Sequence, residues 1–226
     1  SKPVPVIMVS SLTQRGAGVT LDALERGALD YVANPETGAD TDAALRDELL
    51  RKIRAMAGTD VRRMLEIRRE RKARMEARKA RGPIELPPPV SAAVDLNDKC
   101  VAIGISTGGP PALTSLFETL APPTPPIVVV QHMPANFTAP FAWRLNSVSR
   151  LSIKEASAGD VLKPSHVYIA PGGQHLYLRK EAGQVKIRLR EGEAVSGHKP
   201  SVDIMMTSAA EVYGSRCLGG RGHHNV

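Results

Sequence analysis

The second half of the sequence alternates between short apolar runs and longer amphipathic segments, and this alternation constrains the fold more than any other feature. The apolar runs have the length and β-branched content of buried strands, and they cover residues 99–105, 125–132 and 166–172. The amphipathic segments have the spacing of helices, and they cover residues 110–120, 136–149 and 201–214. Strands that alternate with helices form a parallel sheet with helices on both faces. The sequence therefore predicts a doubly wound α/β domain over residues 99–226.

One segment of this domain follows a different pattern. Residues 174–191 alternate between apolar and polar side chains in two arms, which are separated by Glu181, Ala182 and Gly183. A period of two residues on either side of a short glycine-containing turn is typical of a β-hairpin. We therefore expect a hairpin in addition to the parallel sheet.

The first 60 residues repeat the α/β pattern on a smaller scale. A strand is predicted at 3–11, a short helix at 18–27, a second strand at 28–32 and a longer helix at 40–57. Two strands and two helices make a poor independent core. We therefore interpret this segment as the last part of a doubly wound domain whose beginning lies outside the chain.

A basic helix and a proline-rich stretch are predicted between these two parts. Residues 61–81 contain ten basic and three acidic side chains, a local excess of +7 that equals the net charge of the whole chain. Pairs of opposite charge at i,i+4 favour a solvated linker helix, and the aromatic side chains of a nucleic-acid-binding surface are lacking. Prolines in residues 82–98 favour an extended linker. The predicted units are residues 1–60, 61–98 and 99–226, with no nucleic-acid partner.

Composition limits the environment of the protein. No apolar run approaches the roughly 20 residues that cross a bilayer, and the N-terminus lacks the order of a signal peptide. The two cysteines, Cys100 and Cys217, lie far apart in the sequence without the spacing of a metal or redox motif. We expect a cytoplasmic protein with two buried thiols, without membrane insertion, disulfide or zinc site.

The stretch Gly104-Ile105-Ser106-Thr107-Gly108 has the form G-x-S-x-G between a predicted buried strand and the start of a helix. Flanking glycines allow a sharp turn, so that the serine hydroxyl projects at the carboxyl edge of the sheet. The free N–H groups of a helix start can receive an oxyanion. A phosphate-binding loop and a plain strand-to-helix turn remain alternatives. A dinucleotide-binding turn fits less well, because Ser106 occupies the place of the second glycine in G-x-G-x-x-G.

A serine hydroxyl needs a base to act as a nucleophile. His132 directly follows the next predicted strand, and adjacent parallel strands end at the same edge of a sheet. We therefore expect His132 close to Ser106, with a structural histidine as the alternative. The other histidines are placed less well, in the hairpin flanks, a glycine-containing loop and the C-terminal tail: His166, His175, His198, His223 and His224.

Four stretches can be compared, in this order, with the motifs of a known family: "VAIGISTGGPPAL", "VVVQHMPANFTAPFAWRLN", "AGDVLKPSHVYIAPGGQHLYL" and "GHKPSVDIMM". From residue 99 to about residue 218 the chain resembles the catalytic domain of the CheB family of chemotaxis protein-glutamate methylesterases. The resemblance implies that Ser106 is the nucleophile and His132 its base. Residues 5–35 resemble the second half of that family's receiver domain, a flavodoxin-like α/β domain.

The resemblance also implies an activity and partners. Family members hydrolyse glutamyl methyl esters on methyl-accepting chemotaxis receptors and deamidate receptor glutamines in the cytoplasm. Backbone N–H groups at Thr107 and Gly108 would stabilise the oxyanion, without metal or cofactor. An intact receiver domain would interact with the chemotaxis histidine kinase.

The sequence departs from the family pattern in the receiver part. Ser10 matches the hydroxyl residue that responds to phosphorylation, but Asn34 stands where receivers carry a lysine before Pro35. An amide supplies no positive charge to hold an acyl phosphate. We therefore expect a weak phosphorylation response even from a completed receiver.

A second departure concerns the third catalytic residue. The family's aspartate lies in a glycine-rich loop after the strand that follows "YGSRCLG", whereas this chain continues as "GRGHHNV". We expect the acid to be absent, the sheet edge to be left unpaired and activity to be impaired; a frameshift or gene boundary would explain residues 219–226. Asp160, in a turn, and Asp203, in a first helical turn, are the possible substitutes.

Two other functions stay open. An α/β-hydrolase orders its triad as serine, acid, histidine, so its base would be His223 or His224. A non-catalytic fragment that binds receptor or kinase is the other alternative.

Overall fold

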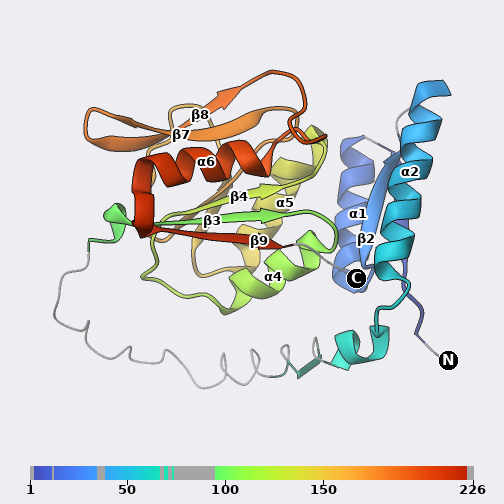
Figure 1. Ribbon diagram of the computed structural model, residues 1–226. Helices are drawn as coiled ribbons and strands as arrows, with labels where there is room; N and C mark the ends of the chain where they lie inside the picture. The colour runs from blue at the N-terminus through green and yellow to red at the C-terminus, as the bar shows by residue number, and fades with distance from the viewer. Residues whose placement is uncertain are drawn as a thin grey trace.

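The larger part of the molecule is built on one parallel sheet. The computed structural model describes residues 3–11, 13–34, 39–66, 69–70, 73 and 95–222. The sheet has the order β5-β6-β4-β3-β9, and all its neighbouring strands are parallel. In chain order the strands are β3 (Cys100–Ile105), β4 (Ile127–Gln131), β5 (Ser152–Glu155), β6 (His166–Ile169) and β9 (Cys217–Gly222). Figure 1 shows them between two layers of other elements.

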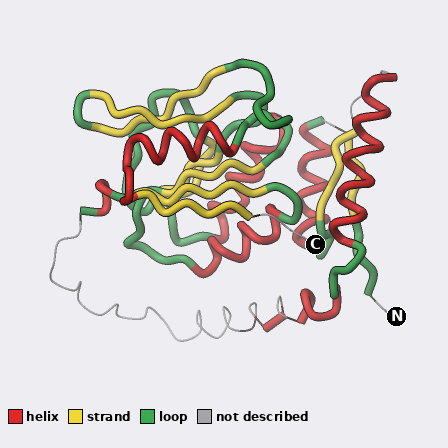
Figure 2. Tube along the Cα trace, viewed as in Figure 1, coloured by secondary structure: helices red, strands yellow, loops and turns green. Residues whose placement is uncertain are grey.

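Helices cover both faces of this sheet, as predicted for a doubly wound domain (Figure 2). Helices α4 (Gly109–Thr119) and α5 (Ala135–Val148) lie on one face. Helix α6 (Val202–Tyr213) and the predicted hairpin, β7 (His175–Glu181) with β8 (Gln184–Arg190), lie on the other.

Alternate residues of the fully buried strand β4 face the two layers. Val129 packs with Phe117 and Phe137 of the α4–α5 layer. Val130 packs with Met205 of α6 in a second core cluster. Burial on both faces explains the continuous apolar run in the sequence.

Two strands of the sheet were not predicted from the sequence. In β5 only Ile153 is fully buried, so the strand has no apolar run. Strand β9 is rich in glycine, yet it pairs with β3 from Cys100↔Cys217 to Ile105↔Gly222. Among the described residues β9 is the last strand on this side of the sheet, so the expected unpaired edge lies at β9 and not at β3. The exposed edge belongs to β9, whose Leu218 is 69% exposed.

The N-terminal segment forms a small second sheet. Strands β1 (Ile7–Ser11) and β2 (Asp30–Asn34) are parallel, and helices α1 (Gln14–Arg26) and α2 (Ala39–Met56) follow them. Helix α1 begins four residues before the predicted start, because the Thr13 hydroxyl caps it by accepting a hydrogen bond from the Gly16 N–H at 3.0 Å. Asn34 ends β2 with its side chain exposed.

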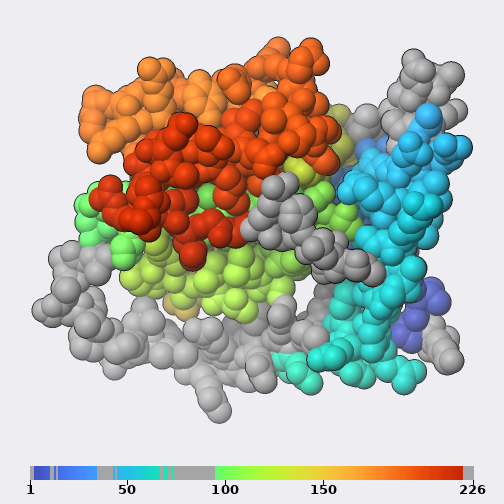
Figure 3. Space-filling model, viewed as in Figure 1, coloured from blue at the N-terminus to red at the C-terminus, as the bar shows by residue number. Residues whose placement is uncertain are grey.

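This segment packs against the larger domain and shares its core. Leu21 and Leu24 of α1 belong to the same buried cluster as Phe141 of α5. The rings of Tyr31 and Phe137 stack with centroids 5.0 Å apart. In Figure 1 the segment lies beyond the carboxyl ends of β3 and β4, and in Figure 3 its blue-to-cyan atoms form one side of the molecule. It is therefore placed where it can reach the edge of the sheet that carries Ser106.

Most of the predicted linker lies outside the described residues. Residues 61–66 are helical, and Val61 packs with Leu29 and Met56. The proline-rich stretch before residue 95 and the histidines of the tail, His223 and His224, belong to the undescribed part. Among the described residues, none of the helices has the length and apolar character to span a bilayer.

Candidate active site

The turn that carries Ser106 joins β3 to α4. Gly108 has φ +72°, a left-handed conformation that glycine adopts without strain, and the Gly109 N–H donates to the Ser106 carbonyl at 3.0 Å. Gly104 has a different role. A Cβ there would lie 2.2 Å from Cγ1 of Val202, so glycine is needed for the close approach of α6 to β3. Only one of the two motif glycines therefore shapes the turn.

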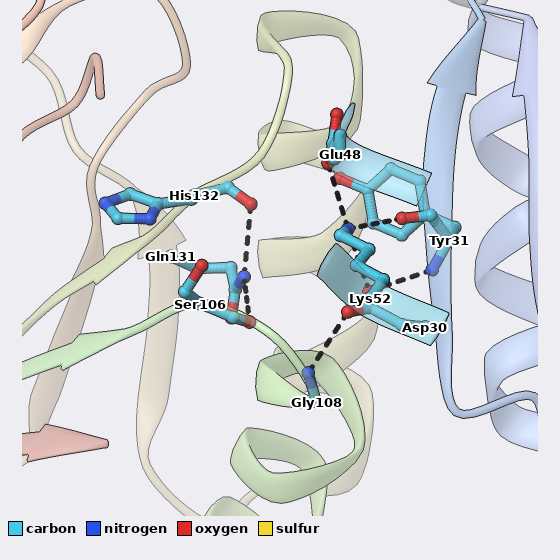
Figure 4. Close-up of polar contacts among 8 residues, drawn as sticks. All are labelled: Asp30, Tyr31, Glu48, Lys52, Ser106, Gly108, Gln131 and His132. Carbon is cyan, nitrogen blue, oxygen red and sulfur yellow. Dashed lines mark hydrogen bonds and ion pairs between the residues drawn. The ribbon is translucent and has the colours of Figure 1, made fainter. Parts of the chain in front are cut away.

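His132 lies beside this turn, as expected for neighbouring parallel strands. Ile105 and Gln131, the last residues of β3 and β4, are register partners, and the His132 N–H donates to the Ile105 carbonyl at 3.3 Å. Ser106 and His132 line one cavity of about 610 Å³. The structure thus brings together the two side chains singled out from the sequence (Figure 4).

Gln131 connects the two turns and was missed by the sequence analysis. Its side chain is 2% exposed, and its Nε2 donates to the carbonyls of Ser106 at 3.0 Å and His132 at 3.1 Å. A Cβ on Gly109 would lie 1.7 Å from the Gln131 Oε1, which explains the second glycine of the pair. A polar residue at the end of an otherwise apolar strand is the signal that could have pointed to this role.

The remaining described histidines divide into two kinds. His166 bonds the Pro164 carbonyl and His175 bridges two backbone groups, so both are structural. His198 instead lines the cavity, and its ring stacks on that of His132 with centroids 3.8 Å apart. A histidine given little weight in the sequence therefore belongs to the site.

A carboxylate of the N-terminal segment reaches the Ser106 turn. Asp30 is 2% exposed, and its Oδ2 accepts from the Gly108 N–H at 3.2 Å while Oδ1 accepts from the Tyr31 N–H at 2.8 Å. The Lys52 Nζ lies 3.4 Å from Asp30 Oδ1 and 3.1 Å from Glu48 Oε1. Burial raises the pKa of Asp30, and attraction to Lys52 offsets only part of this shift. One predicted oxyanion donor is therefore bonded to a carboxylate here (Figure 4).

The two proposed substitutes for the third catalytic residue have other contacts. Asp160 accepts from the Ser157 N–H at 2.8 Å and pairs with Lys154. Asp203 accepts from the Ser196 hydroxyl at 2.8 Å and lines a separate hollow. The described residues that line the cavity of Ser106 and His132 include neither aspartate. Within the described parts of the chain, acidic, histidine and cysteine side chains form no cluster of three that could hold a metal ion.

The two cysteines, distant in sequence, are neighbours in the sheet. Cys100 and Cys217 are register partners on β3 and β9, and both are free thiols. A hydrogen bond from the Cys100 thiol lowers the pKa of Cys217 to about 7. Cys217 is only half-buried, so the expectation of two buried thiols is wrong for this residue. Cys217 is more exposed than Cys100 because β9 is an edge strand.

A parallel α/β sheet whose adjacent strands lead into a serine and a histidine could supply the nucleophile and the base of a serine hydrolase. A family model described as CheB methylesterase matches residues 101–220. The chain therefore belongs to the CheB methylesterase family.

Individual relatives agree with this assignment. The chain is 42% identical over 220 residues to the protein-glutamate methylesterase/protein-glutamine glutaminase of Sulfurimonas denitrificans, with 96% of this chain and 60% of the relative covered. A protein of the same description from Xanthomonas campestris pv. campestris is also 42% identical, with 96% and 62% covered. The chain thus spans about 60% of the length of these relatives.

A solved structure agrees as well. The CheB methylesterase catalytic domain of Thermotoga maritima superposes with a TM-score of 0.52 at 44% identity, covering 54% of this chain and 66% of that chain. This match supports the α/β fold with a mostly parallel central sheet.

Proposed function

We propose that the protein is a protein-glutamate methylesterase that hydrolyses glutamyl methyl esters on methyl-accepting chemotaxis receptors, and that it deamidates receptor glutamines by the same path. The observation that carries the proposal is the pair Ser106 and His132, which directly follow the register-paired ends of β3 and β4 and line one cavity. The descriptions of the relatives support the substrate class.

The proposed reaction is a two-step acyl transfer. His132 takes the proton of the Ser106 hydroxyl, and the oxygen attacks the ester carbonyl. The tetrahedral oxyanion collapses, and methanol leaves with the proton from His132. Water, deprotonated by the same histidine, then attacks the acyl-enzyme; His132 returns the proton to the leaving Ser106 oxygen, and the glutamate is released. Ammonia replaces methanol as the leaving group when the substrate is glutamine.

The backbone N–H groups of Thr107 and Gly108 are the proposed oxyanion donors. The Gly108 N–H donates to Asp30 in this structure, so a substrate that uses this donor first displaces the carboxylate. The N-terminal segment therefore lowers the reactivity of the site as long as Asp30 stays in place.

The family resemblance implies a third catalytic residue, an aspartate in a loop beyond the strand that β9 forms. Such an acid fixes the tautomer of the base and stabilises its cation, and disabling it costs on the order of 10⁴ in kcat. We propose that the protein acts in the cytoplasm under the control of the chemotaxis histidine kinase.

Labelling with a fluorophosphonate tests the proposal, together with methanol release from methylated receptor. We expect Ser106 to be labelled, and Ser106→Ala or His132→Ala to abolish labelling, while Ser147→Ala on α5 serves as the matched control.

Two other results would contradict the proposal. Labelling that survives His132→Ala but disappears when both His223→Ala and His224→Ala are introduced would support the α/β-hydrolase order of catalytic residues. If Ser106 of the wild-type protein stays unlabelled while the protein binds receptor, the result would support the non-catalytic role. The hydrogen bond from the Gly108 N–H to Asp30 favours this alternative.

A further inference from the structure

Two imidazole rings lie face to face in the cavity of Ser106. The ring of His198, which comes from the loop between β8 and α6, stacks on the ring of His132 with centroids 3.8 Å apart and an interplanar angle of 10°. Both residues line the cavity with Ser106. One face of the proposed base is therefore covered by a second histidine.

The position of His198 is determined by a tight turn. The N–H of Val195 donates to the His198 carbonyl, and the N–H of His198 donates to the Val195 carbonyl, both at 3.1 Å. The two residues between them, Ser196 and Gly197, have φ values of +53° and +75°, as in the two-residue turns that close β-hairpins. Asp203 accepts a hydrogen bond from the Ser196 hydroxyl at 2.8 Å. This turn holds the backbone of His198 in one place.

The ring of His198 is also oriented. Its Nδ1 lies 2.8 Å from the Ser196 carbonyl oxygen. A carbonyl only accepts hydrogen bonds, so Nδ1 carries a proton and donates it. The neutral form of His198 therefore has its lone pair on Nε2.

The base of the loop is clamped by a third histidine. His175 is 1% exposed; its Nε2 donates to the Glu193 carbonyl at 2.9 Å, and its Nδ1 accepts from the Ser201 N–H at 3.1 Å. These bonds tie both ends of the loop to strand β7. The stack on His132 is thus supported by contacts at the tip and at the base of the loop.

We propose that His198 is a positioning residue for His132. By stacking on the His132 ring, His198 holds the plane of that ring so that one of its nitrogens faces the Ser106 hydroxyl. This role rests on the proposed function. A base whose ring tilts by a small angle loses the alignment that proton transfer needs. Two stacked cations at this separation repel each other, so His198 also opposes the protonation of His132.

Other charged groups lie near the same stacked pair. Lys199 is adjacent in the loop, and the N-terminal segment contributes charged side chains to the cavity, which are Asp47, Glu48, Arg51 and Lys52. Asp203 reaches the turn through Ser196. A comparison of variants that change only His198 leaves all these groups in place.

The test uses His198→Ala and His198→Phe in the 226-residue chain, with the rate of fluorophosphonate labelling at Ser106 measured between pH 5 and pH 9. We expect the alanine variant to label about 10-fold to 100-fold more slowly, because misplacement of a catalytic group costs rates of this order. The phenylalanine variant keeps a stacking ring, so it should recover most of the rate. The phenylalanine side chain cannot become a cation, so the midpoint of the pH profile of labelling should move upward in this variant.

His166 supplies a matched control, because its Nδ1 also bonds the carbonyl two residues earlier, at 2.9 Å from Pro164. His166→Ala should change neither the labelling rate nor its pH midpoint. The proposal would be overturned if both His198 variants had the labelling rate and the pH midpoint of the wild-type protein. If the wild-type serine does not react, the proposed function fails, and NMR titration of the His132 ring decides the stacking role separately. A His132 titration that is identical with and without His198 would overturn it.

Discussion

The Asp30 carboxylate accepts a hydrogen bond from the Gly108 N–H at 3.2 Å, although the two residues are 78 positions apart. Gly108 is the helix-start residue beside Ser106, and Asp30 begins a strand of the N-terminal segment. A negative charge at this donor opposes the oxyanion that the proposed reaction forms. The contact therefore couples the packing of the N-terminal segment to the chemistry of the turn.

Asp30→Asn should raise the reactivity of Ser106. The amide keeps an acceptor for the Gly108 N–H but removes the charge, so we expect fluorophosphonate labelling to be about 10-fold faster, equivalent to about 1.4 kcal/mol of repulsion removed. Loss of the buried partner of Lys52 should lower the melting temperature at the same time. Asp22→Asn, which removes an exposed carboxylate of the same segment, is the control. Slower labelling by Asp30→Asn would show that Asp30 assists the site.

Gln131→Leu should loosen the connection between the turns that carry Ser106 and His132. The substitution leaves the carbonyls of Ser106 and His132 without their shared donor, and a lost buried partner costs about 1–3 kcal/mol. Urea unfolding should show this loss, and labelling of Ser106 should slow with it. Gln184→Leu, at an exposed position of the hairpin, should leave both measurements unchanged. Normal labelling in a destabilised Gln131→Leu protein would limit Gln131 to a structural role.

Gly104→Ala should destabilise the fold through α6. The added methyl group would lie 2.2 Å from Val202 Cγ1, and overpacking of this kind costs about 1–3 kcal/mol. Val202→Ala in the same chain should recover part of the loss, because the pair interacts directly. Gly220→Ala meets no atom within 4 Å and should be neutral in the same unfolding assay. Additive effects in the double variant would contradict the packing explanation.

Cys217 should react with iodoacetamide at lower pH than an ordinary thiol. The pKa of Cys217 is lowered to about 7 by the Cys100 thiol, and the thiolate is the reactive form. The alkylation rate, followed by mass spectrometry, should rise with a midpoint near this pH in the native protein. Cys100→Ala should move the midpoint up toward the ordinary value of about 8.5. An unchanged midpoint in Cys100→Ala would show that the strand pairing does not couple the thiols.

Part of the fold follows from local sequence patterns. The apolar runs of β3 and β4 predict buried parallel strands, and parallel neighbours end at one edge, so the sequence predicts that Ser106 and His132 lie near each other. No such pattern predicts β5 and β9. Their residues lack a local strand signal, and only pairing with β6 and β3 makes them strands.

What the sequence by itself determined is therefore the doubly wound fold and the meeting of Ser106 with His132, because both follow from residue periodicity and strand order. The tertiary structure alone decided the contacts of Asp30 with Gly108, of His198 with His132 and of Cys100 with Cys217. Each of these joins segments far apart in the chain. Their meeting depends on how helices and strands pack, and short-range patterns carry no information about that packing.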